Sequence, residues 1–193
     1  MSEIVEPSSS PTKLLKAMLV NRYSGEYLQG MRRYVFGDEV QNEGRWADFI
    51  VQDTWQGSVS LDLRESHGYP RHGFEIKVSR SDWLNELKDP FKAQAFIPYC
   101  HYWYLVIANE SMVKKDELPD NWGLLVPRGE NLYTITKAKR NKEVKPMPNP
   151  MMVSFMRRID EVAREKRVFN AHVLLQDFVK NTIDEVPLFD GVK

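Results

Sequence analysis

Hydrophobic side chains near the start of the chain recur at the spacing of a helix. Over residues 13–34 they lie at helical intervals, at Leu14, Leu15, Met18, Leu19, Tyr23, Tyr27 and Met31. Gly25 and Gly30 interrupt this pattern, because glycine weakens the interior of a helix. The spacing therefore predicts either one broken helix or two short helices.

Shorter apolar runs predict a series of strands. The run at 45–53, "RWADFIVQD", has apolar residues on both faces, which is typical of a buried strand. The run at 57–65, "GSVSLDLRE", alternates apolar and polar positions, as a half-buried strand does. Further strands are predicted at 33–41, 71–79, 101–109, 122–127 and 132–138.

Three later segments have the signals of helices. Ser79 and Asp82 form a capping box at the start of a helix over 80–98, which Asp89 and Pro90 divide in two. An amphipathic helix follows at Met152, Phe155, Met156, Ile159 and Val162, and a last helix at 168–181. The order of helices and strands predicts an α/β core.

Composition divides the chain into five segments. Residues 1–12 are rich in serine and proline and are expected to be a disordered tail. Residues 13–136 form the predicted domain, and 137–150 a basic, proline-containing linker. Residues 151–181 form a helical appendage, and 182–193 a second tail.

Charge and cysteine content restrict the function classes only weakly. The 193 residues contain 27 basic and 27 acidic side chains, so nucleic-acid binding would need a local basic patch. The single Cys100 excludes an internal disulfide and favours a cytoplasmic location. The longest apolar run, 102–108, is too short to span a membrane, so no membrane partner is expected.

Candidate chemistry lies in the stretch "GFEIKVSRSDW", 73–83. Glu75 and Lys77 are two residues apart, so in a strand they point to the same face. The triplet Glu-x-Lys also begins at Glu86 and Glu143, but only at Glu75 does it lie in an apolar strand with an acid, Asp48, on the strand upstream. Two interpretations are equally compatible with this pattern, a catalytic site or a structural salt bridge.

A catalytic site of this type would use a hard metal ion. Carboxylate oxygens such as those of Asp48 and Glu75 bind Mg²⁺, which lowers the pKa of a bound water and offsets charge on a phosphate. The ammonium group of Lys77 could orient that water or stabilise the developing negative charge. The pattern is therefore consistent with phosphodiester hydrolysis.

Two stretches, "RWADFIV" and "GFEIKVSRSDWLNELKDPFKAQAFIPYC", resemble the PD-(D/E)XK nuclease superfamily. The resemblance covers about residues 35–127, and it is most specific over 73–104. It is closest to the MmcB-like proteins, proposed DNA-repair nucleases, and to related phage and actinobacterial proteins. It implies a restriction-endonuclease-like core: a helix, a three-stranded antiparallel meander, a helix and a strand, with a mixed central sheet and C-terminal helices.

The resemblance also implies roles for individual residues. Asp48, Glu75 and Lys77 take the catalytic places, and Glu39 matches an acid often found just upstream. Glu39, Asp48 and Glu75, with the carbonyl of Ile76, would hold Mg²⁺ or Mn²⁺.

The sequence departs from the superfamily pattern in two places. Ala47 stands where the superfamily name has proline, as it does in the related proteins. The long interval between Asp48 and Glu75 suggests an inserted hairpin, and it contains Asp62, a rival for the first acid. Asp48 is preferred because it lies on a buried strand, where an unpaired carboxylate is costly.

The predicted substrate is DNA, in repair, recombination or phage DNA processing. Arg80, Lys88, Lys92 and Gln94 are candidate DNA contacts after the catalytic strand, although a solvated helix face would have the same composition. Residues 137–145 carry five basic side chains and one acidic one, as either a phosphate contact or a solvated loop would.

The alternative functions are a non-catalytic DNA-binding or regulatory module with a nuclease fold, and an interaction protein that uses its C-terminal helices. A homodimer would suit cleavage of both strands of a duplex.

Overall fold

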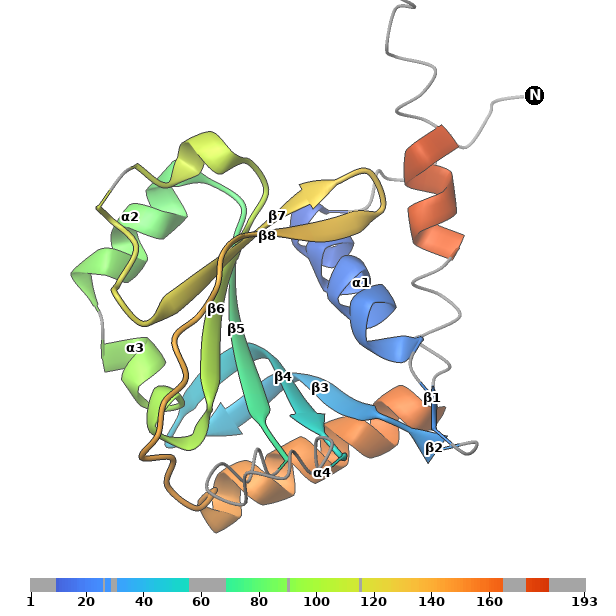
Figure 1. Ribbon diagram of the computed structural model, residues 1–193, viewed down its shortest axis with the longest axis vertical. Helices are drawn as coiled ribbons and strands as arrows, with labels where there is room; N and C mark the ends of the chain where they lie inside the picture. Colours follow the sequence, from blue (N-terminus) through green and yellow to red (C-terminus); the bar gives the residue numbers. More distant parts are fainter. Residues whose placement is uncertain are drawn as a thin grey trace, which may run out of the picture.

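A six-stranded mixed sheet forms the centre of the protein (Figure 1). The computed structural model describes residues 10–25, 27–28, 31–55, 69–89, 91–114, 116–164 and 173–180. The strands lie in sequence order across the sheet: β3 (Tyr34–Asn42), β4 (Arg45–Asp53), β5 (Arg71–Lys77), β6 (Tyr102–Ile107), β7 (Trp122–Arg128) and β8 (Asn131–Thr136).

The sheet combines antiparallel and parallel pairs. β3, β4 and β5 form an antiparallel meander, β5, β6 and β7 are parallel, and β8 returns antiparallel to β7. The predicted α/β fold with a mixed central sheet is therefore confirmed, whereas its assignment to the restriction-endonuclease class stays a prediction. The strand predicted at 57–65, with Asp62, lies outside the described residues.

The first helix is shorter than its hydrophobic pattern predicted. α1 (Pro11–Ser24) begins at Ser10, whose hydroxyl accepts a hydrogen bond from the Lys13 N–H, and it ends at Gly25. The expected helical continuation to residue 34 is wrong, because β1 (Tyr27–Leu28) pairs with β2 (Met31–Arg32) instead. Glycine ends the helix at the position where the sequence suggested a break.

The helical segment after β5 is divided as predicted. α2 (Arg80–Lys88) starts at Ser79, whose Oγ accepts the Asp82 N–H at 3.2 Å. It is followed by α3 (Phe91–Gln94) and the 3₁₀ turn η1 (Ile97–Tyr99), and a second 3₁₀ turn, η2 (Glu110–Met112), follows β6. No helix of the described segments is both long and apolar enough to cross a membrane.

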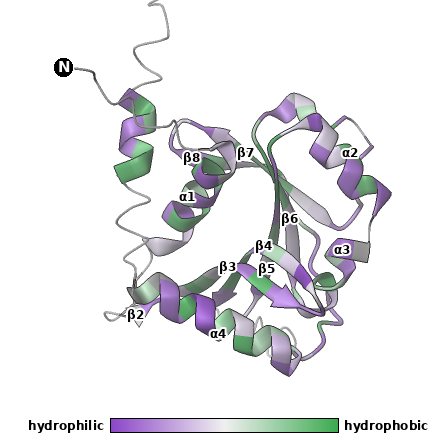
Figure 2. Ribbon diagram, turned by 180° about the vertical axis from the view of Figure 1, so that it is seen from behind, coloured by the Kyte–Doolittle hydropathy of each residue, from purple (hydrophilic) through white to green (hydrophobic). Residues whose placement is uncertain are grey.

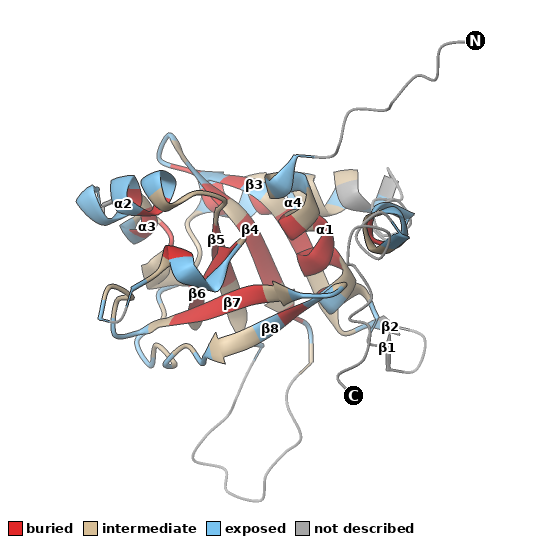
Figure 3. Ribbon diagram, turned by 90° about the horizontal axis from the view of Figure 1, so that it is seen from above, coloured by how far each residue is buried: buried red, intermediate tan, exposed pale blue. Residues whose placement is uncertain are grey.

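Helices cover both faces of the sheet, and the central strands are the most buried part of the protein (Figure 3). α1 and the helix at 173–180 pack on one face, where Leu19, Phe74 and Leu175 are buried. α3 and α4 (Asn149–Arg164) pack on the other face through Ala93 and Met151. The residues that the sequence assigns to an appendage thus contribute to the core of the sheet.

The buried face of α4 differs from the predicted one. Met151 and Phe155 are buried, but Met152 and Met156 are 40% and 61% exposed. Figure 2 shows hydrophobic and hydrophilic residues alternating along α4. The helix lies close to β3 because Gly37 has no side chain: a Cβ there would lie 2.6 Å from the Cβ of Arg158.

Candidate active site

Glu75 and Lys77 lie on the same face of β5. Their neighbours Phe74 and Ile76 pack into the core on the α1 face, so the two charged side chains point to the face covered by α2 and α3. The Lys77 ammonium donates to Glu75 Oε1 at 2.6 Å. The glutamate side chain is 1% exposed and the lysine side chain 11%, so this is a buried ion pair.

Asp48 reaches the same strand from β4. Its Oδ2 accepts a hydrogen bond from the Ile76 N–H at 2.7 Å. Phe49 is paired with Phe74, so the antiparallel register brings Asp48 next to Glu75. The structure therefore brings together the three residues that the sequence assigns to catalysis.

The regular alternation of side chains between the two faces of the sheet is interrupted in β3 and β4, near Asp48. Phe36 packs on the α1 face of the sheet and Val40 on the opposite face, although a regular strand would direct both to one face. Glu39, between them, has a positive φ of 51°, a conformation that is uncommon outside glycine. The alternation of sides changes at Glu39 on β3, and on β4 it changes between Ala47 and Phe49.

α2 and α3 complete a cluster of charges around Glu75. Glu86, on α2, accepts from Lys77 through Oε2 at 2.7 Å. Lys92, on α3, donates to Glu75 Oε1 at 2.7 Å and lies 3.5 Å from Glu86 Oε2. With Asp48, the cluster contains three carboxylates and two ammonium groups, so it carries an excess of negative charge.

Burial and this excess of negative charge together change the acidity of Glu75. Burial raises the pKa of its carboxyl group to about 7, and the negative charge of Asp48 adds to the increase, against the opposing effect of Lys77. Burial disfavours the Lys77 ammonium, but Glu75 and Glu86 more than offset that effect, so the pKa of Lys77 is raised. Lys77 is therefore positively charged, while Glu75 can exchange a proton near neutral pH.

A hollow of about 360 Å³ opens beside Lys77. It is bounded by the end of β5, by α2 and α3, and by the first turn of α1, at Thr12, Ile76, Lys77, Val78, Asp82, Asn85, Glu86, Asp89 and Lys92. Lys77 and Glu86 connect the buried cluster to this hollow. A phosphate group or an attacking water in the hollow would therefore have access to the Lys77 ammonium.

Glu39 is directed elsewhere, contrary to its predicted role as a ligand beside Asp48 and Glu75. Its side chain is 53% exposed, and its carboxylate accepts from Lys16 at 2.9 Å and from Arg158 at 3.4 Å. It joins α1, β3 and α4. The positive φ of Glu39 interrupts the alternation of sides along β3, whereas its assignment as a ligand came from the resemblance alone.

The predicted DNA contacts fall into different environments. Arg80 is engaged by Glu117 and by the Met112 carbonyl, which join α2 to the segment after β6. Lys88 is exposed at the end of α2, and Gln94 lines a second hollow on the far side of α3. Lys92 belongs to the charge cluster itself.

Sequence reasoning missed the part that Glu86 plays. Trp83 and Glu86 lie three residues apart on α2, and both are buried against the sheet. The Glu-x-Lys triplet at Glu86 has the composition of a solvated helix, so it gave no sign of burial. The available signal was the spacing from Trp83, because a tryptophan indicates the face of a helix that packs inward.

The donor atoms suit a hard cation such as Mg²⁺, although the set is small. Among the described residues, no group of three histidine, cysteine, aspartate or glutamate side chains could hold a metal as it stands. Asp48 and Glu75 would supply two carboxylates and Ile76 a carbonyl, and Mg²⁺ usually keeps several waters. Glu86 Oε1 is buried with no hydrogen-bond partner in the described segments, so further acceptor capacity lies close by.

Comparison with known proteins finds a similar fold but gives no information about the chemistry of the site. No family model matches the sequence, and no curated protein matches it. A solved structure of a protein of unknown function from Silicibacter pomeroyi is similar, with a TM-score of 0.54 and 16% sequence identity. The similarity covers 95% of this chain and all of the other, so the two proteins share an overall fold.

Proposed function

We propose that the protein is a metal-dependent nuclease that hydrolyses phosphodiester bonds in DNA. The observation that carries the proposal is the meeting of Asp48, Glu75 and Lys77 at one point of β4 and β5, beside a hollow. The raised pKa of buried Glu75 supports it, because perturbed carboxyl groups beside a cavity are common at functional sites. The resemblance of 73–104 to PD-(D/E)XK nucleases points to the same chemistry.

Each residue has a distinct task in this proposal. Asp48, Glu75 and the Ile76 carbonyl would hold Mg²⁺ or Mn²⁺, which when bound supplies charge neutralisation and an activated water. The Lys77 ammonium stabilises the negative charge that develops on the scissile phosphate. Glu86 holds Lys77 in position, since its Oε2 lies 2.7 Å from Nζ. DNA repair, recombination or phage DNA processing in the cytoplasm is the proposed setting.

One observation favours a second candidate, a DNA-binding or regulatory module without turnover. Both Lys77 and Lys92 pair with Glu75 Oε1, so the carboxylate already has its counter-charge within the protein. In a non-catalytic module this cluster would be a structural ion-pair network. The two candidates differ in what the removal of Lys77 does.

The test is Lys77→Met, which keeps most of the side-chain stem and removes the charge. In the nuclease, cleavage of DNA in Mg²⁺ should fall by about 10²–10³, because one preorganised charge-stabilising group is lost. DNA binding per folded molecule should stay close to that of the wild type. Lys180→Met, at an exposed position that does not line the hollow, is the matched control and should cut normally.

Two outcomes would reject the nuclease. In the first, the wild type cuts no single-stranded, double-stranded or branched DNA in Mg²⁺ or Mn²⁺, or cuts equally well in chelator. In the second, Lys77→Met melts far below the wild type but retains full activity per folded molecule. That result would assign the pair to architecture, since breaking a buried ion pair costs about 3–5 kcal/mol.

A further inference from the structure

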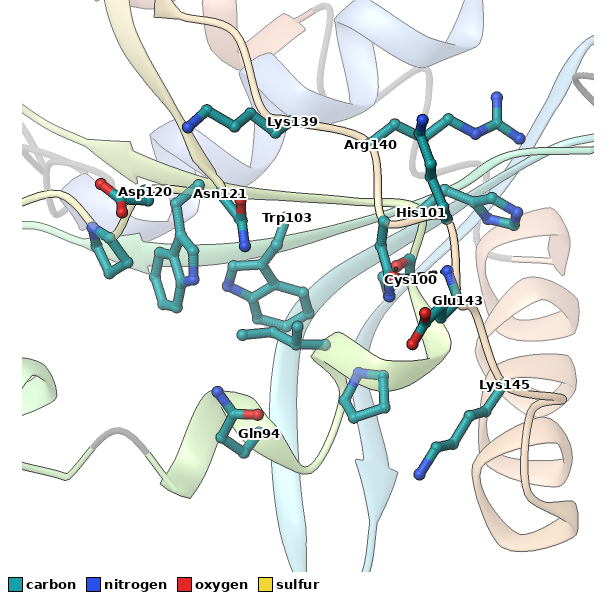
Figure 4. Close-up of a pocket in the computed structure, with 16 residues that line it drawn as sticks. Gln94, Cys100, His101, Trp103, Asp120, Asn121, Lys139, Arg140, Glu143 and Lys145 are labelled. Carbon is teal, nitrogen blue, oxygen red and sulfur yellow. Dashed lines mark hydrogen bonds between the residues drawn. The ribbon is translucent and has the colours of Figure 1, made fainter. Parts of the chain in front are cut away.

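A second and larger hollow, of about 670 Å³, lies beside α3 (Figure 4). Lys92 of α3 faces the first hollow, and Gln94, two residues later, lines the second. Its other walls are η1, the start of β6, the turn at 119–122 and the segment at 139–145. A polymer bound in the second hollow would therefore need to pass only α3 to reach Lys77.

The segment at 139–145 is fixed by its backbone, which leaves its side chains available. The backbone N–H groups of Lys139, Asn141 and Lys145 donate to the carbonyls of Asn121, His101 and Pro98, at 3.2, 2.8 and 2.8 Å. The cationic groups of the lysines on this segment and of Arg140 form no ion pair in the part of the chain that the structure describes. The backbone thus holds these residues beside the hollow, and none of their cationic groups is paired with a carboxylate among the described residues.

The hollow is basic although the chain as a whole is neutral. Four basic side chains line it, Lys139, Arg140, Lys142 and Lys145, against only two acidic ones, Asp120 and Glu143. The local potential also acts on His101, whose pKa is lowered to about 4 by burial and by the positive charges of Arg140 and Arg71. An anionic ligand would meet a favourable field here.

Two tryptophans form the apolar wall of the hollow. Trp122 is half-buried and packs edge-on against Trp103, with ring centroids 6.0 Å apart. Trp103 is 3% exposed, and its indole N–H has no acceptor among the described residues. Figure 4 shows this indole in the middle of the lining residues. The Trp103 N–H is itself buried, so the wall offers the ring face of Trp122, which would suit a nucleobase.

We propose that this hollow binds a single-stranded stretch of DNA, with phosphates on Lys139, Arg140 and Lys142 and a base against Trp122. A duplex fits these observations less well. Its bases are paired and stacked inside the double helix, so they cannot enter the hollow and contact Trp122. The inference rests on the proposed nuclease function and narrows its substrate. The substrate is DNA with an unpaired end or flap, which lies across α3 between the second hollow and Lys77.

The experiment measures binding of the full chain to a fluorescein-labelled oligothymidylate of about 12 nucleotides. Fluorescence anisotropy is recorded in chelator, between about 50 and 200 mM salt, with a duplex of equal length for comparison. Replacing Lys139, Arg140 and Lys142 together by Gln should weaken single-strand binding at least tenfold. The log–log salt slope should fall by about two, because three single-strand phosphate contacts are lost.

A charge-matched control uses Lys13, Lys114 and Lys180, which are exposed and line neither hollow. Their replacement by Gln should change single-strand binding less than twofold. The inference is overturned if both triple variants behave alike, or if the wild type prefers the duplex. It is also overturned if Lys139, Arg140 and Lys142 can be replaced with the salt slope unchanged.

The outcome is separable from that of the proposed function, because binding is measured without metal or cleavage. Single-strand binding that depends on the three residues, with no cleavage by any form of the protein, rejects the nuclease and supports the site. Cleavage that requires Lys77 but not these residues, with single-strand binding unchanged in their triple variant, supports the nuclease and rejects the site.

Discussion

Glu75 is the residue whose environment is most demanding, because it is a buried acid beside two other carboxylates. Its pKa is raised to about 7 by burial first and by Asp48 second. Between pH 4.5 and 7 the folded protein therefore holds a proton that the unfolded chain has lost. By linkage, Glu75 makes the folded state less stable as the pH rises through this window, and the effect levels off above it.

The first prediction concerns this pH dependence in metal-free protein. From the raised pKa, Glu75 should account for about 3 kcal/mol of the stability lost between pH 4.5 and 8. Glu75→Gln has no carboxyl group to titrate at this position. Between pH 4.5 and 8 its unfolding free energy should therefore fall by about 3 kcal/mol less than that of the wild type. Urea unfolding in chelator at several pH values gives the difference.

The control and the role of metal follow from the same linkage. Glu110→Gln, at an exposed position, should follow the wild-type profile. Added Mg²⁺ should stabilise the wild type more at pH 8 than at pH 5, because the ionised carboxylate is the ligand, and it should not stabilise Glu75→Gln. Parallel profiles for the wild type and Glu75→Gln would show that the acid is not perturbed.

At this scale the sequence predicted the parts of the site that depend on local geometry. The two-residue spacing of a strand places Glu75 and Lys77 on one face, and a buried neighbouring strand makes Asp48 costly unless it has a partner. Lys92 and Glu86 join the cluster because α2 and α3 pack back against β5. No spacing along the chain specifies that, so Lys92 could only be predicted as a DNA contact.

Among the elements, α4 shows where periodicity is ambiguous. Two overlapping apolar stripes both include Phe155, and the sequence favoured the one with Met152 and Met156. The structure buries Met151 and exposes Met156, because the position of the helix is set by its approach to Gly37 on β3. The sequence alone does not indicate which helix will pack against a glycine on a strand.

This close approach makes Gly37→Ala a test of how α4 is packed. The new Cβ would lie 2.6 Å from Arg158 Cβ and 3.4 Å from the Phe155 ring, so the helix must move away from β3. Unfolding in urea should show a loss of about 1–3 kcal/mol, as overpacking usually causes.

Gly25→Ala is the matched control for this prediction. Nothing lies within 4 Å of its Cβ position, and its φ of −92° suits alanine. It should be neutral or should stabilise the protein by less than about 1 kcal/mol. Equal stability of the Gly37→Ala protein and the wild type would mean that α4 is held loosely against the sheet.

Across the whole molecule, the sequence predicted the fold class because its strands were marked by strong apolar runs. The order β5–α2–α3–β6 follows from a parallel pair that needs a helical crossover. The division at residue 136 came from composition alone, since charged and proline-containing segments usually mark linkers. In the structure, that segment connects the sheet to α4, which is part of the same core. Met151 and Phe155 of α4 pack against Val40 and Ile50.

The last prediction tests that division by ending the chain at residue 148. This removes α4 and the helix at 173–180, and with them the buried side chains of Met151, Phe155 and Leu175. The apolar surface of β3 and β4 would then face water, as a large exposed patch that favours aggregation. The shortened protein should be recovered mainly as aggregate by size-exclusion chromatography, without the cooperative thermal unfolding of the full chain.

A chain that ends at residue 181 keeps every described residue and should behave as the full protein does. The contrary result is a monomeric 1–148 protein with a sharp melting transition. It would mean that the first 136 residues form an independent domain and that α4 only rests on its surface. The burial of Met151 and Phe155 argues for the first outcome, because helix and sheet share one continuous core.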